Sequence, residues 1–279
     1  MPSLHVEIFE GREATVNSYL VMNESHVVII DALRNRQEAA ELAARARMTG
    51  REVQAIFVTH GHPDHYIGIR TLKEAFPRAR ILVASAEIKV DIIGFSTWMN
   101  GVGWLDGQPQ MKPKSAESTD GFDYERELEV LSGPTLELEG GGALQIRADY
   151  PATECAHLTT LFCPEAKALF VSDLCYHKVH AWAGQGVLRE HIASWVRVLG
   201  DLKAEYFGAE VTVYPGHGKP GGVELFDTVR AYLDDFTAAV DAARTNAELT
   251  ERMIKLHSGH AQADFLLAYS VAFHGPDKA

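Results

Sequence analysis

The chain has 279 residues, of which 46% are hydrophobic and 23% charged, the usage of a globular protein with ample apolar material for a core. Its 38 acidic residues outnumber 26 basic ones, and the formal net charge of −12 excludes nucleic acid as an expected partner, because phosphates would be repelled. Three cysteines without Cys-x-x-Cys spacing indicate neither a disulfide framework nor a structural zinc knuckle. The sequence shows no signal-peptide pattern and no apolar run of membrane-spanning length, so we expect a cytoplasmic protein with no membrane partner.

The first third of the chain alternates strand-like runs with helical ones. Runs rich in β-branched residues predict strands at residues 4–9, 16–22, 27–31, 54–59 and 81–84. Helices are expected at residues 39–48, 67–75 and 86–93. Asn35 followed by Glu38 is typical of a helix start, and Gly50 suits the end of the first helix.

The regular pattern fails from residue 94 to about residue 127. This stretch carries Phe95, Trp98, Met99 and Trp104 among glycines, prolines and lysines, a composition typical of a long functional loop or of a disordered insertion. We therefore predict a lid over residues 94–127. Its aromatic side chains favour an apolar or aromatic acyl group in the substrate, although such residues can equally fill the core beneath a loop.

The second half repeats the arrangement of the first. Strands are expected at residues 128–131, 135–138, 144–147, 158–163, 168–171 and 211–214. Helices are expected at residues 188–202, 225–240 and 265–273. Two strand-rich halves with flanking helices predict an α/β (α+β) fold with two sheets packed face to face and helices outside. We expect one domain over residues 1–279, closed by helices from about residue 222.

The most informative run of the chain is Thr-His-Gly-His-Pro-Asp-His, which directly follows the strand expected at residues 54–59. It places three imidazoles and a carboxylate within six residues, at His60, His62, Asp64 and His65, although the whole chain holds only 13 histidines. Histidine and carboxylate ligands suit zinc, manganese or iron. Alternate residues can point to opposite sides of a loop, so this one segment could supply ligands to two metals.

This His-x-His-x-Asp-His run resembles the signature of the metallo-β-lactamase superfamily, whose fold is a four-layer αββα sandwich. The resemblance spans nearly the whole chain, because further landmarks of the family stand in the expected order, with Asp31 before the run and His157, Asp173 and His217 after it. It implies two divalent metal ions, most simply Zn²⁺, with iron or manganese as alternatives. One metal would take His60, His62 and His157, the other would take Asp64, His65 and His217, and Asp173 would bridge them.

Two of these landmarks need comment. Where the family usually shows Gly-His-Thr-x-Gly, this chain reads Ala-His-Leu-Thr-Thr around His157, so Glu154 and Asp149 stay candidates to replace or support that histidine. Asp31 is expected to orient a ligand through hydrogen bonds rather than to touch metal. A plain turn aspartate is the alternative for Asp31.

A tyrosine, Tyr176, follows Asp173 by three residues. The arrangement resembles that of metal-dependent lactonases of the superfamily, in which the phenol assists the substrate carbonyl or the leaving oxygen. A buried core tyrosine is the alternative. His177, His180 and Trp182 continue toward the expected pocket mouth, and we expect His180 to be an exposed loop histidine.

Two metal ions can share a hydroxide, which makes a nucleophile at neutral pH, and can polarise a carbonyl. The resemblance therefore implies a binuclear hydrolase of a small-molecule ester or lactone that uses a metal-bridging hydroxide, with Asp64, Asp173 and Tyr176 as catalytic residues. His62 stands where flavodiiron proteins have glutamate, and exported β-lactamases lack the equivalent of either His65 or Asp173. Alternatives are a mononuclear iron oxidoreductase similar to sulfur dioxygenases, a β-lactam hydrolase, or a thioesterase, although glyoxalase-type thioesterases typically show Gly-Cys-Gly-Arg after the bridging aspartate.

Overall fold

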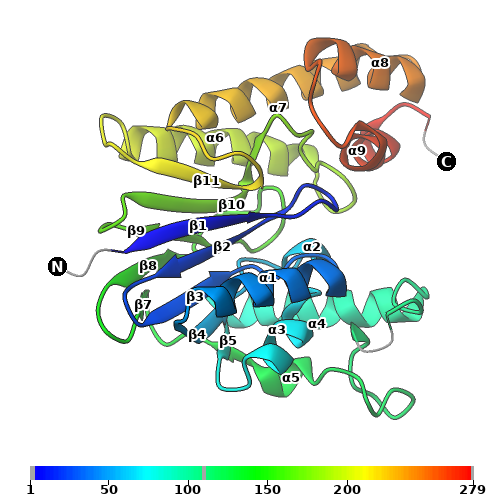
Figure 1. Ribbon diagram of the computed structural model, residues 1–279. Coiled ribbons are helices and arrows are strands. Elements are labelled where there is room, and N and C mark those ends of the chain that lie inside the picture. Colours follow the sequence, from blue (N-terminus) through cyan, green and yellow to red (C-terminus); the bar gives the residue numbers. More distant parts are fainter. Residues whose placement is uncertain (1–3, 109–110, 278–279) are drawn as a thin grey trace. The chain divides into compact units, whose positions relative to one another are not determined.

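A computed structural model describes residues 4–108 and 111–277 of the chain (Figure 1). The chain divides into two compact units. The first comprises Met1–Asp149 and His157–Ala168, and the second comprises Tyr150–Ala156 and Leu169–Ala279. The single domain expected over residues 1–279 stays a prediction.

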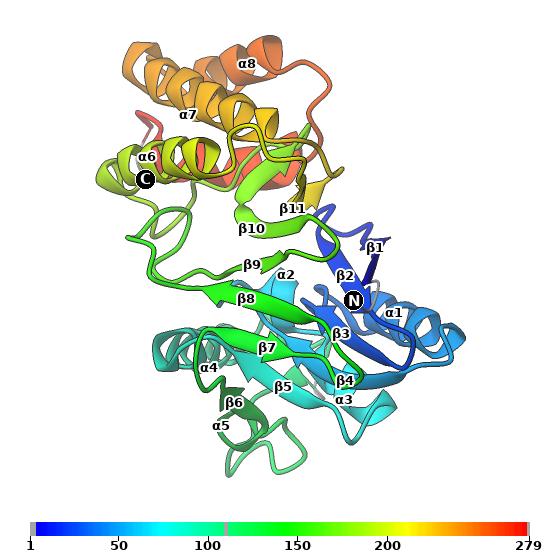
Figure 2. The same cartoon turned by 90° about the vertical axis from the view of Figure 1, so that its left-hand side faces the viewer.

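A six-stranded sheet organises the first unit (Figures 1 and 2). Its strands follow one another in chain order as β1 (His5–Glu10), β2 (Asn17–Met22), β3 (His26–Ile30), β4 (Glu52–Phe57), β5 (Arg80–Val83) and β6 (Leu128–Val130). The first three strands run antiparallel, whereas β3 to β6 pair in parallel. Parallel strands need crossover segments, which helices provide here. Burial on both faces explains the continuously apolar stretches at residues 27–30 of β3 and 81–83 of β5.

Helices of the described chain cover this sheet within the same unit. They are α1 (Arg36–Met48), α2 (Pro63–Tyr66), α3 (Ile69–Ala75), α4 (Ala86–Gly101) and α5 (Tyr124–Glu127). Helix α1 begins as predicted, because the Asn35 side chain accepts a hydrogen bond from the backbone N–H of Glu38. Leu42 of α1, Leu72 of α3 and Ile88 of α4 join the sheet residues in one hydrophobic core.

Helix α4 corrects the prediction that regular structure fails at residue 94. The helix continues through Gly94 to Gly101, because Ile88, Ile92 and Met99 extend a buried stripe along one face. One glycine lowers helix stability by only about 1 kcal/mol relative to alanine. The packing of the stripe therefore outweighs the glycine. Of the predicted lid, residues 109 and 110 lie outside the described residues, and its role in covering a substrate stays a prediction.

Three further strands of the first unit pair antiparallel (Figure 2). They are β7 (Thr135–Glu137), β8 (Ala143–Arg147) and β9 (Thr160–Cys163). The turn between β7 and β8 contains Gly140, Gly141 and Gly142, all with positive φ. A side chain would strain each of these positions, so the three glycines allow the hairpin to close.

The second unit contains two neighbouring strands and a group of helices. These elements are β10 (Ala168–His177), α6 (Arg189–Glu205), β11 (Thr212–Gly218), α7 (Glu224–Ala242), α8 (Asn246–Leu256), a π-helical turn (Ala263–Leu267) and α9 (Ala268–His274). The predicted stripe of α7 is buried, including Phe226, Leu233 and Phe236, and α7 packs against α6, whose Trp195 is fully buried.

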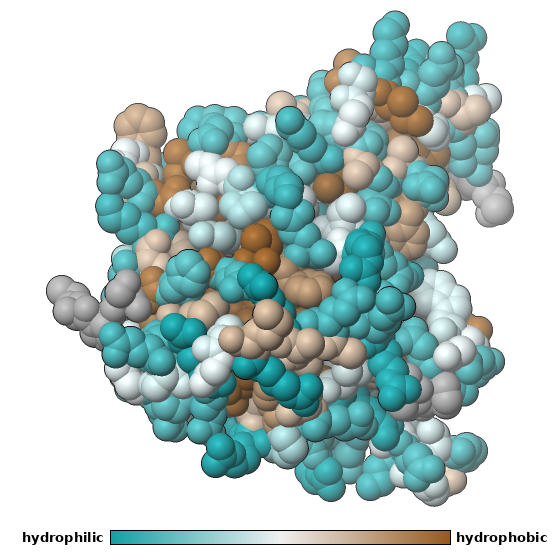
Figure 3. Space-filling model, viewed as in Figure 1, coloured by the Kyte–Doolittle hydropathy of each residue, from teal (hydrophilic) through white to brown (hydrophobic). Residues whose placement is uncertain are grey.

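Within residues 4–108 and 111–277, no helix combines the length and apolarity needed to span a bilayer. Hydrophilic side chains cover most of the face drawn in Figure 3.

His180 is buried in the second unit, which corrects the expectation that it is an exposed loop histidine. Only 1% of its surface is accessible. Its Nδ1 lies 3.1 Å from Tyr232 Oη, and its ring centroid lies 5.4 Å from that of His260. Burial, together with the neighbouring His260 and His257, lowers the pKa of His180 to about 4. Packing against α7 and the segment after α8 therefore keeps this imidazole neutral.

The buried histidine predicts acid sensitivity. An unfolded histidine takes up its proton near pH 6.5, whereas folded His180, with its pKa lowered to about 4, does so only in stronger acid. The unfolded state then binds more protons between these values, so the free energy of unfolding should decrease as the pH falls through this window. His257 and His260, whose pKa values burial also lowers, act in the same direction, and Asp235 beside His257 opposes them in part.

Urea unfolding of metal-free protein between pH 7 and pH 5 tests this. His180→Phe keeps a ring in the same space, and its unfolding free energy should depend less steeply on pH than that of the wild type. His5→Gln, on an exposed position of β1, is the control and should keep the wild-type slope. Equal slopes for His180→Phe and the wild type would show that His180 does not cause the acid sensitivity.

Candidate metal centre

The histidine-rich run forms a compact loop in the first unit, directly after β4. His60 and His65 are fully buried and Asp64 is nearly so. The ring of His60 lies 4.8 Å from that of His62 and 4.3 Å from that of His65, measured between centroids. One possible ligand atom of His60 lies within 4.8 Å of one of His62, and the same holds for Asp64 and His65. Three imidazoles and a carboxylate packed this closely have the donor chemistry of a divalent-metal site.

Asp31 holds this loop in place from the end of β3. Its buried carboxylate accepts hydrogen bonds from Thr59 N at 2.8 Å and Thr59 Oγ1 at 2.9 Å, and its Oδ2 lies 2.7 Å from His65 Nδ1. Burial raises the pKa of Asp31, while the His65 and Thr59 contacts lower it. With Nδ1 facing a carboxylate, His65 keeps Nε2 for another partner, as metal-binding histidines commonly do. Asp31 thus has the contacts expected of a residue that orients a ligand.

Gly61, between the first two histidines, allows the loop to lie directly on helix α4. A Cβ atom at this position would lie 2.7 Å from Cβ of Asp91, too close for any side chain. The loop also runs beside the segment that precedes β9, because Thr159 N donates to Thr59 O at 3.0 Å and His60 pairs with Leu158. These backbone contacts fix the positions of His60 and His62.

The structure places His157 beside α4. Its Nδ1 lies 2.7 Å from Oδ2 of Asp91, and 41% of its side chain is exposed. Among the described residues, His157 does not belong to the side chains whose possible ligand atoms lie within 4.8 Å of those of His60 and His62. Asp149 is exposed and pairs with Arg147. Nothing in the sequence pattern pointed to Asp91 as the neighbour of His157, because Asp91 lies inside a predicted helix far along the chain.

A second group of predicted site residues lies in the second unit. Asp173 is buried in β10, where its Oδ2 accepts a hydrogen bond of 2.7 Å from Tyr176 Oη and lies 3.3 Å from His217 Nε2. The ring of Tyr176 stacks on that of His217, with centroids 4.7 Å apart and planes 9° from parallel. Tyr176 is buried, but it contacts two predicted ligands rather than the apolar core alone.

Glu154 belongs to this second group. It is 1% exposed, and one of its carboxylate oxygens lies within 4.8 Å of one of Asp173. Two carboxylates buried so close together repel one another unless a proton or a cation lies between them. Carboxylate oxygens are ligands that divalent cations commonly take.

Gly216 in β11 shows how tightly this group is packed. A Cβ atom there would lie 1.8 Å from Oδ1 of Asp173. Only glycine therefore lets β11 pass the carboxylate and present His217 beside it. Lack of space beside Asp173 therefore explains why the sequence Tyr-Pro-Gly-His-Gly has a glycine immediately before His217.

An aromatic ridge, formed by Phe95, Trp98 and Trp104, leads away from the histidine loop in the first unit. The ring centroids of Phe95 and Trp98 are 5.3 Å apart, and those of Trp98 and Trp104 are 4.9 Å apart. Phe95 in turn lies 6.4 Å from the ring of His62. Both tryptophans are partly exposed, so the ridge offers apolar surface next to the histidine loop.

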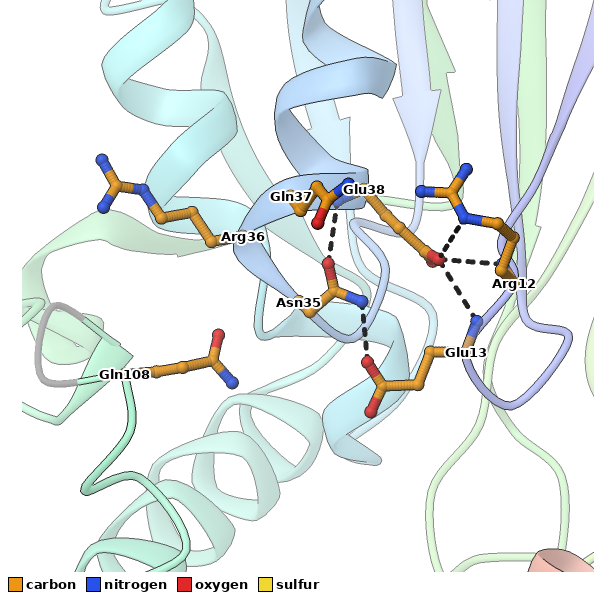
Figure 4. A pocket seen from close by; sticks show the side chains of 7 residues that line it. All are labelled: Arg12, Glu13, Asn35, Arg36, Gln37, Glu38 and Gln108. Carbon is orange, nitrogen blue, oxygen red and sulfur yellow. Dashed lines mark hydrogen bonds and ion pairs between the residues drawn. The ribbon is translucent and has the colours of Figure 1, made fainter.

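A separate surface pocket lies at the start of α1 (Figure 4). Its lining residues are Arg12, Glu13, Asn35, Arg36, Gln37, Glu38 and Gln108. Glu38 accepts hydrogen bonds from the backbone N–H groups of Arg12 and Glu13, at 3.0 and 3.2 Å. The pocket contains none of the predicted metal ligands, and its polar contacts hold the loop after β1 against the helix.

Asp31→Asn tests the role of Asp31 in orienting the loop. The amide has the same size but lacks the charge that His65 and Thr59 face. We expect metal affinity to fall about 10- to 100-fold, the usual effect of removing such a supporting carboxylate. Chelator competition with Zn²⁺ measures this, and Asp149→Asn, at an exposed carboxylate, is the control. Wild-type affinity in Asp31→Asn would show that Asp31 is only a turn residue.

Comparisons with known proteins agree with this picture. The chain is 27% identical over 129 residues to a hydroxyacylglutathione hydrolase of Francisella tularensis subsp. novicida, covering 46% of this chain and 50% of that protein. It thus spans about half the length of the curated relatives it matches.

Solved structures share the fold. A metallo-beta-lactamase family protein from Thermus thermophilus matches with a TM-score of 0.63 and 19% identity, over 96% of this chain and 92% of that one. A metallo-beta-lactamase from Pontibacter korlensis matches with a TM-score of 0.57 and 16% identity, over 83% and 94%. The expected mixed α/β architecture with two sheets is confirmed. A family model described as the metallo-beta-lactamase superfamily matches residues 11–217, and the chain belongs to that superfamily.

Proposed function

We propose that this protein is a metal-dependent hydrolase that opens an ester bond in a small molecule, either a lactone or an open-chain ester, with two divalent cations, most simply Zn²⁺. The observation that carries the proposal is the buried histidine loop, in which His60, His62, Asp64 and His65 converge and Asp31 orients His65. Membership of the superfamily and the relatives named as hydrolases support it.

The proposed ligands are those that the family's pattern implies: His60, His62, Asp64, His65 and His157 in the first unit, and Asp173 and His217 in the second. Divalent cations would polarise a carbonyl and lower the pKa of water. Other residues of the chain position these ligands. Asp31 holds His65, and Tyr176 donates a hydrogen bond to Asp173. Gly61 and Gly216 leave room for the neighbouring Asp91 and Asp173 side chains.

Tyr176 is proposed to stabilise charge on the substrate. Its hydroxyl already lies at hydrogen-bond distance from Asp173, and stacking on His217 fixes the plane of its ring. Before substrate binds, the hydrogen bond from Tyr176 orients the Asp173 carboxylate. Because a phenol has one O–H proton, Tyr176 would release Asp173 and donate instead to the oxyanion that forms when an ester carbonyl is attacked.

The aromatic ridge supports an apolar or aromatic acyl group in the substrate. Trp98 and Trp104 expose part of their rings along a path that begins at Phe95 beside His62. Apolar surface next to polar, metal-binding groups is the usual composition of a small-molecule site. The net charge of −12 makes a polyanionic substrate a poor fit.

A thioester is the second candidate substrate, because the matched relatives are named hydroxyacylglutathione hydrolases. The residues after Asp173 are Leu174, Cys175 and Tyr176, which differ from the Gly-Cys-Gly-Arg pattern that is typical of such thioesterases. Tyr176 contacts Asp173 and His217 at this point of difference. We therefore rank the oxygen ester first.

Metal analysis and a substrate screen test the proposed function. Protein expressed with added zinc should contain about two metal ions per chain by elemental analysis, as the ligand set requires. Across lactones, aryl esters, thioesters and β-lactams, kcat/KM should be highest for a lactone or an aryl ester. One iron per chain with oxygen uptake would indicate an oxidoreductase instead. Fastest turnover of a thioester would indicate that the protein is a thioesterase.

Tyr176→Phe tests the proposed role of the phenol. At saturating metal, kcat on the best ester or lactone should fall about 100- to 1,000-fold, the usual cost of losing one oxyanion donor. Metal content is measured in the same samples, so that a loss of turnover is separated from a loss of metal. Tyr214→Phe, which stacks on Phe170 in the same unit, is the control. Wild-type kcat in Tyr176→Phe would leave the residue a packing role only.

A further inference from the structure

We infer that Ser96 is a positioning residue, which holds the aromatic ridge in a fixed place beside the histidine loop, so that the apolar group of the substrate meets a preformed surface. The inference deepens the proposed function and rests on it in one respect, because it takes the occupant of the ridge to be the acyl group of an ester. All the residues that carry the argument belong to the first unit.

A polar side chain in the apolar stripe of helix α4 is the first argument. Four side chains of α4 are buried, and three of them are apolar, namely Ile88, Ile92 and Met99. The fourth is Ser96, which is fully buried like Tyr66 and donates a hydrogen bond of 3.0 Å from its Oγ to Tyr66 Oη. Tyr66 is the last residue of α2, directly after the histidine run. This buried hydrogen bond therefore joins α4 to the end of the histidine loop, and such a bond favours one arrangement of the elements that it connects.

Tyr124, at the start of α5, extends the connection to the segment after α4. Burial raises the pKa of Tyr124 to about 12, and Ser96, which faces its hydroxyl, opposes part of this rise. Tyr124 Oη donates to Met111 O at 3.1 Å, and the ring centroids of Tyr66 and Tyr124 lie 6.0 Å apart. Helices α2 and α5 both pack against α4. Ser96 thus lies between two phenols, one attached to the histidine loop and the other to the segment that follows the ridge.

The segment after α4 is itself packed into the core. Met111 and Phe122 are buried and belong to the hydrophobic core of the first unit. Backbone hydrogen bonds run from Trp104 N to Met99 O at 2.9 Å and from Phe122 N to Lys112 O at 2.8 Å. Segments that open and close over a site come from the parts of a protein with few buried apolar contacts. The described residues of this segment instead form a fixed wall.

Helical spacing brings the ridge to the histidine loop. Asp91, Phe95 and Trp98 follow one another at i, i+4 and i+7, so they share one face of α4. Asp91 meets the loop at Gly61, where a side chain would have no space, and Phe95 lies beside the second imidazole of the loop, with ring centroids 6.4 Å apart. The contacts of Gly61 and Ser96 therefore set the position of α4, and with it the place of Trp98 relative to the predicted ligands.

Ser96→Ala tests the inference through the KM values of two esters of one alcohol. The variant removes a buried hydroxyl and changes no ring of the ridge and no predicted ligand. KM for the octanoyl ester should rise about fivefold to tenfold, the effect of losing one buried hydrogen bond. KM for the acetyl ester, kcat on both esters and metal content should stay within about twofold of the wild type. A parallel loss of kcat and metal from both esters would instead assign Ser96 to the metal ligands and overturn the inference.

Thr97→Val is the matched control for Ser96→Ala. It removes the hydroxyl of the next residue on α4, which is exposed and donates to Ile93 O at 2.8 Å. Both KM values should stay at those of the wild type. An equal rise of the octanoyl KM in Thr97→Val would show that any change on this helix has the effect, and would remove the specific role of Ser96.

Binding of a ketone gives a readout that needs no turnover. Octan-2-one has an alkyl chain beside a carbonyl but cannot be hydrolysed. Its addition should shift the indole N–H signals of Trp98 and Trp104 in the NMR spectrum, assigned with Trp98→Phe and Trp104→Phe. Ser96→Ala should need about fivefold to tenfold more ketone for the same shift. Exchange of the backbone amides of Trp104 and Phe122 should be slow before the ketone is added and should change less than about threefold afterwards.

The outcomes separate this inference from the proposed function. Wild-type KM and ketone affinity in Ser96→Ala, or a ketone that shifts neither indole signal, would overturn the positioning role. Amides of Trp104 and Phe122 that are protected only with ketone would reveal a closing lid and overturn the preformed surface. Each of these results leaves hydrolysis of an ester, and so the proposed function, intact. Ketone binding that depends on Ser96 in a protein that hydrolyses no ester would contradict the proposed function and support the role of Ser96.

Discussion

The buried carboxylate of Asp31 is the interaction on which the histidine loop depends. It accepts from the backbone and the hydroxyl of Thr59 and faces His65, so one side chain fixes both the beginning and the end of the loop. Such a carboxylate is costly to bury alone, and its three partners offset that cost. The apolar core around it keeps water from competing for those hydrogen bonds. This one anchored charge therefore fixes Thr59 and His65, at the two ends of the loop.

The parallel pairing of β3 and β4 explains why Asp31 can reach the loop. The carboxyl ends of neighbouring parallel strands lie at the same edge of a sheet, and Asp31 follows β3 as Thr59 and His60 follow β4. The backbone contact from Asp31 N to Phe57 O, at 2.8 Å, continues the pairing beyond the strand ends. Helices α1 and α3 cover the parallel strands, so the packing of the hydrophobic core also holds the loop rigid. The histidine loop is thus attached directly to the hydrophobic core of the first unit.

The sequence predicted the strands, the amphipathic helix α7 and the histidine loop, because periodicity and the spacing of ligand-type residues are local properties. It did not predict that α4 continues through Gly94, since the buried stripe outweighs a local breaker only when the core is present. It also placed His180 at the surface, because a single polar residue in a loop carries no signal of the helices that later cover it. The contact between His157 and Asp91 was equally hidden, because the two residues lie 66 positions apart in the sequence. The predicted roles of the individual ligands stay predictions.

The lack of room at Gly216 has a consequence for how this protein can change. Any side chain there would push against Asp173 Oδ1, although Gly216 itself offers no donor and no acceptor side chain. A single nucleotide change in that codon therefore brings a side chain against a buried carboxylate without altering any predicted ligand. At Trp98 and Trp104 of the aromatic ridge, which are 43% and 52% exposed, a substitution displaces no buried group. Random mutation is thus tolerated very unequally at different positions of this chain.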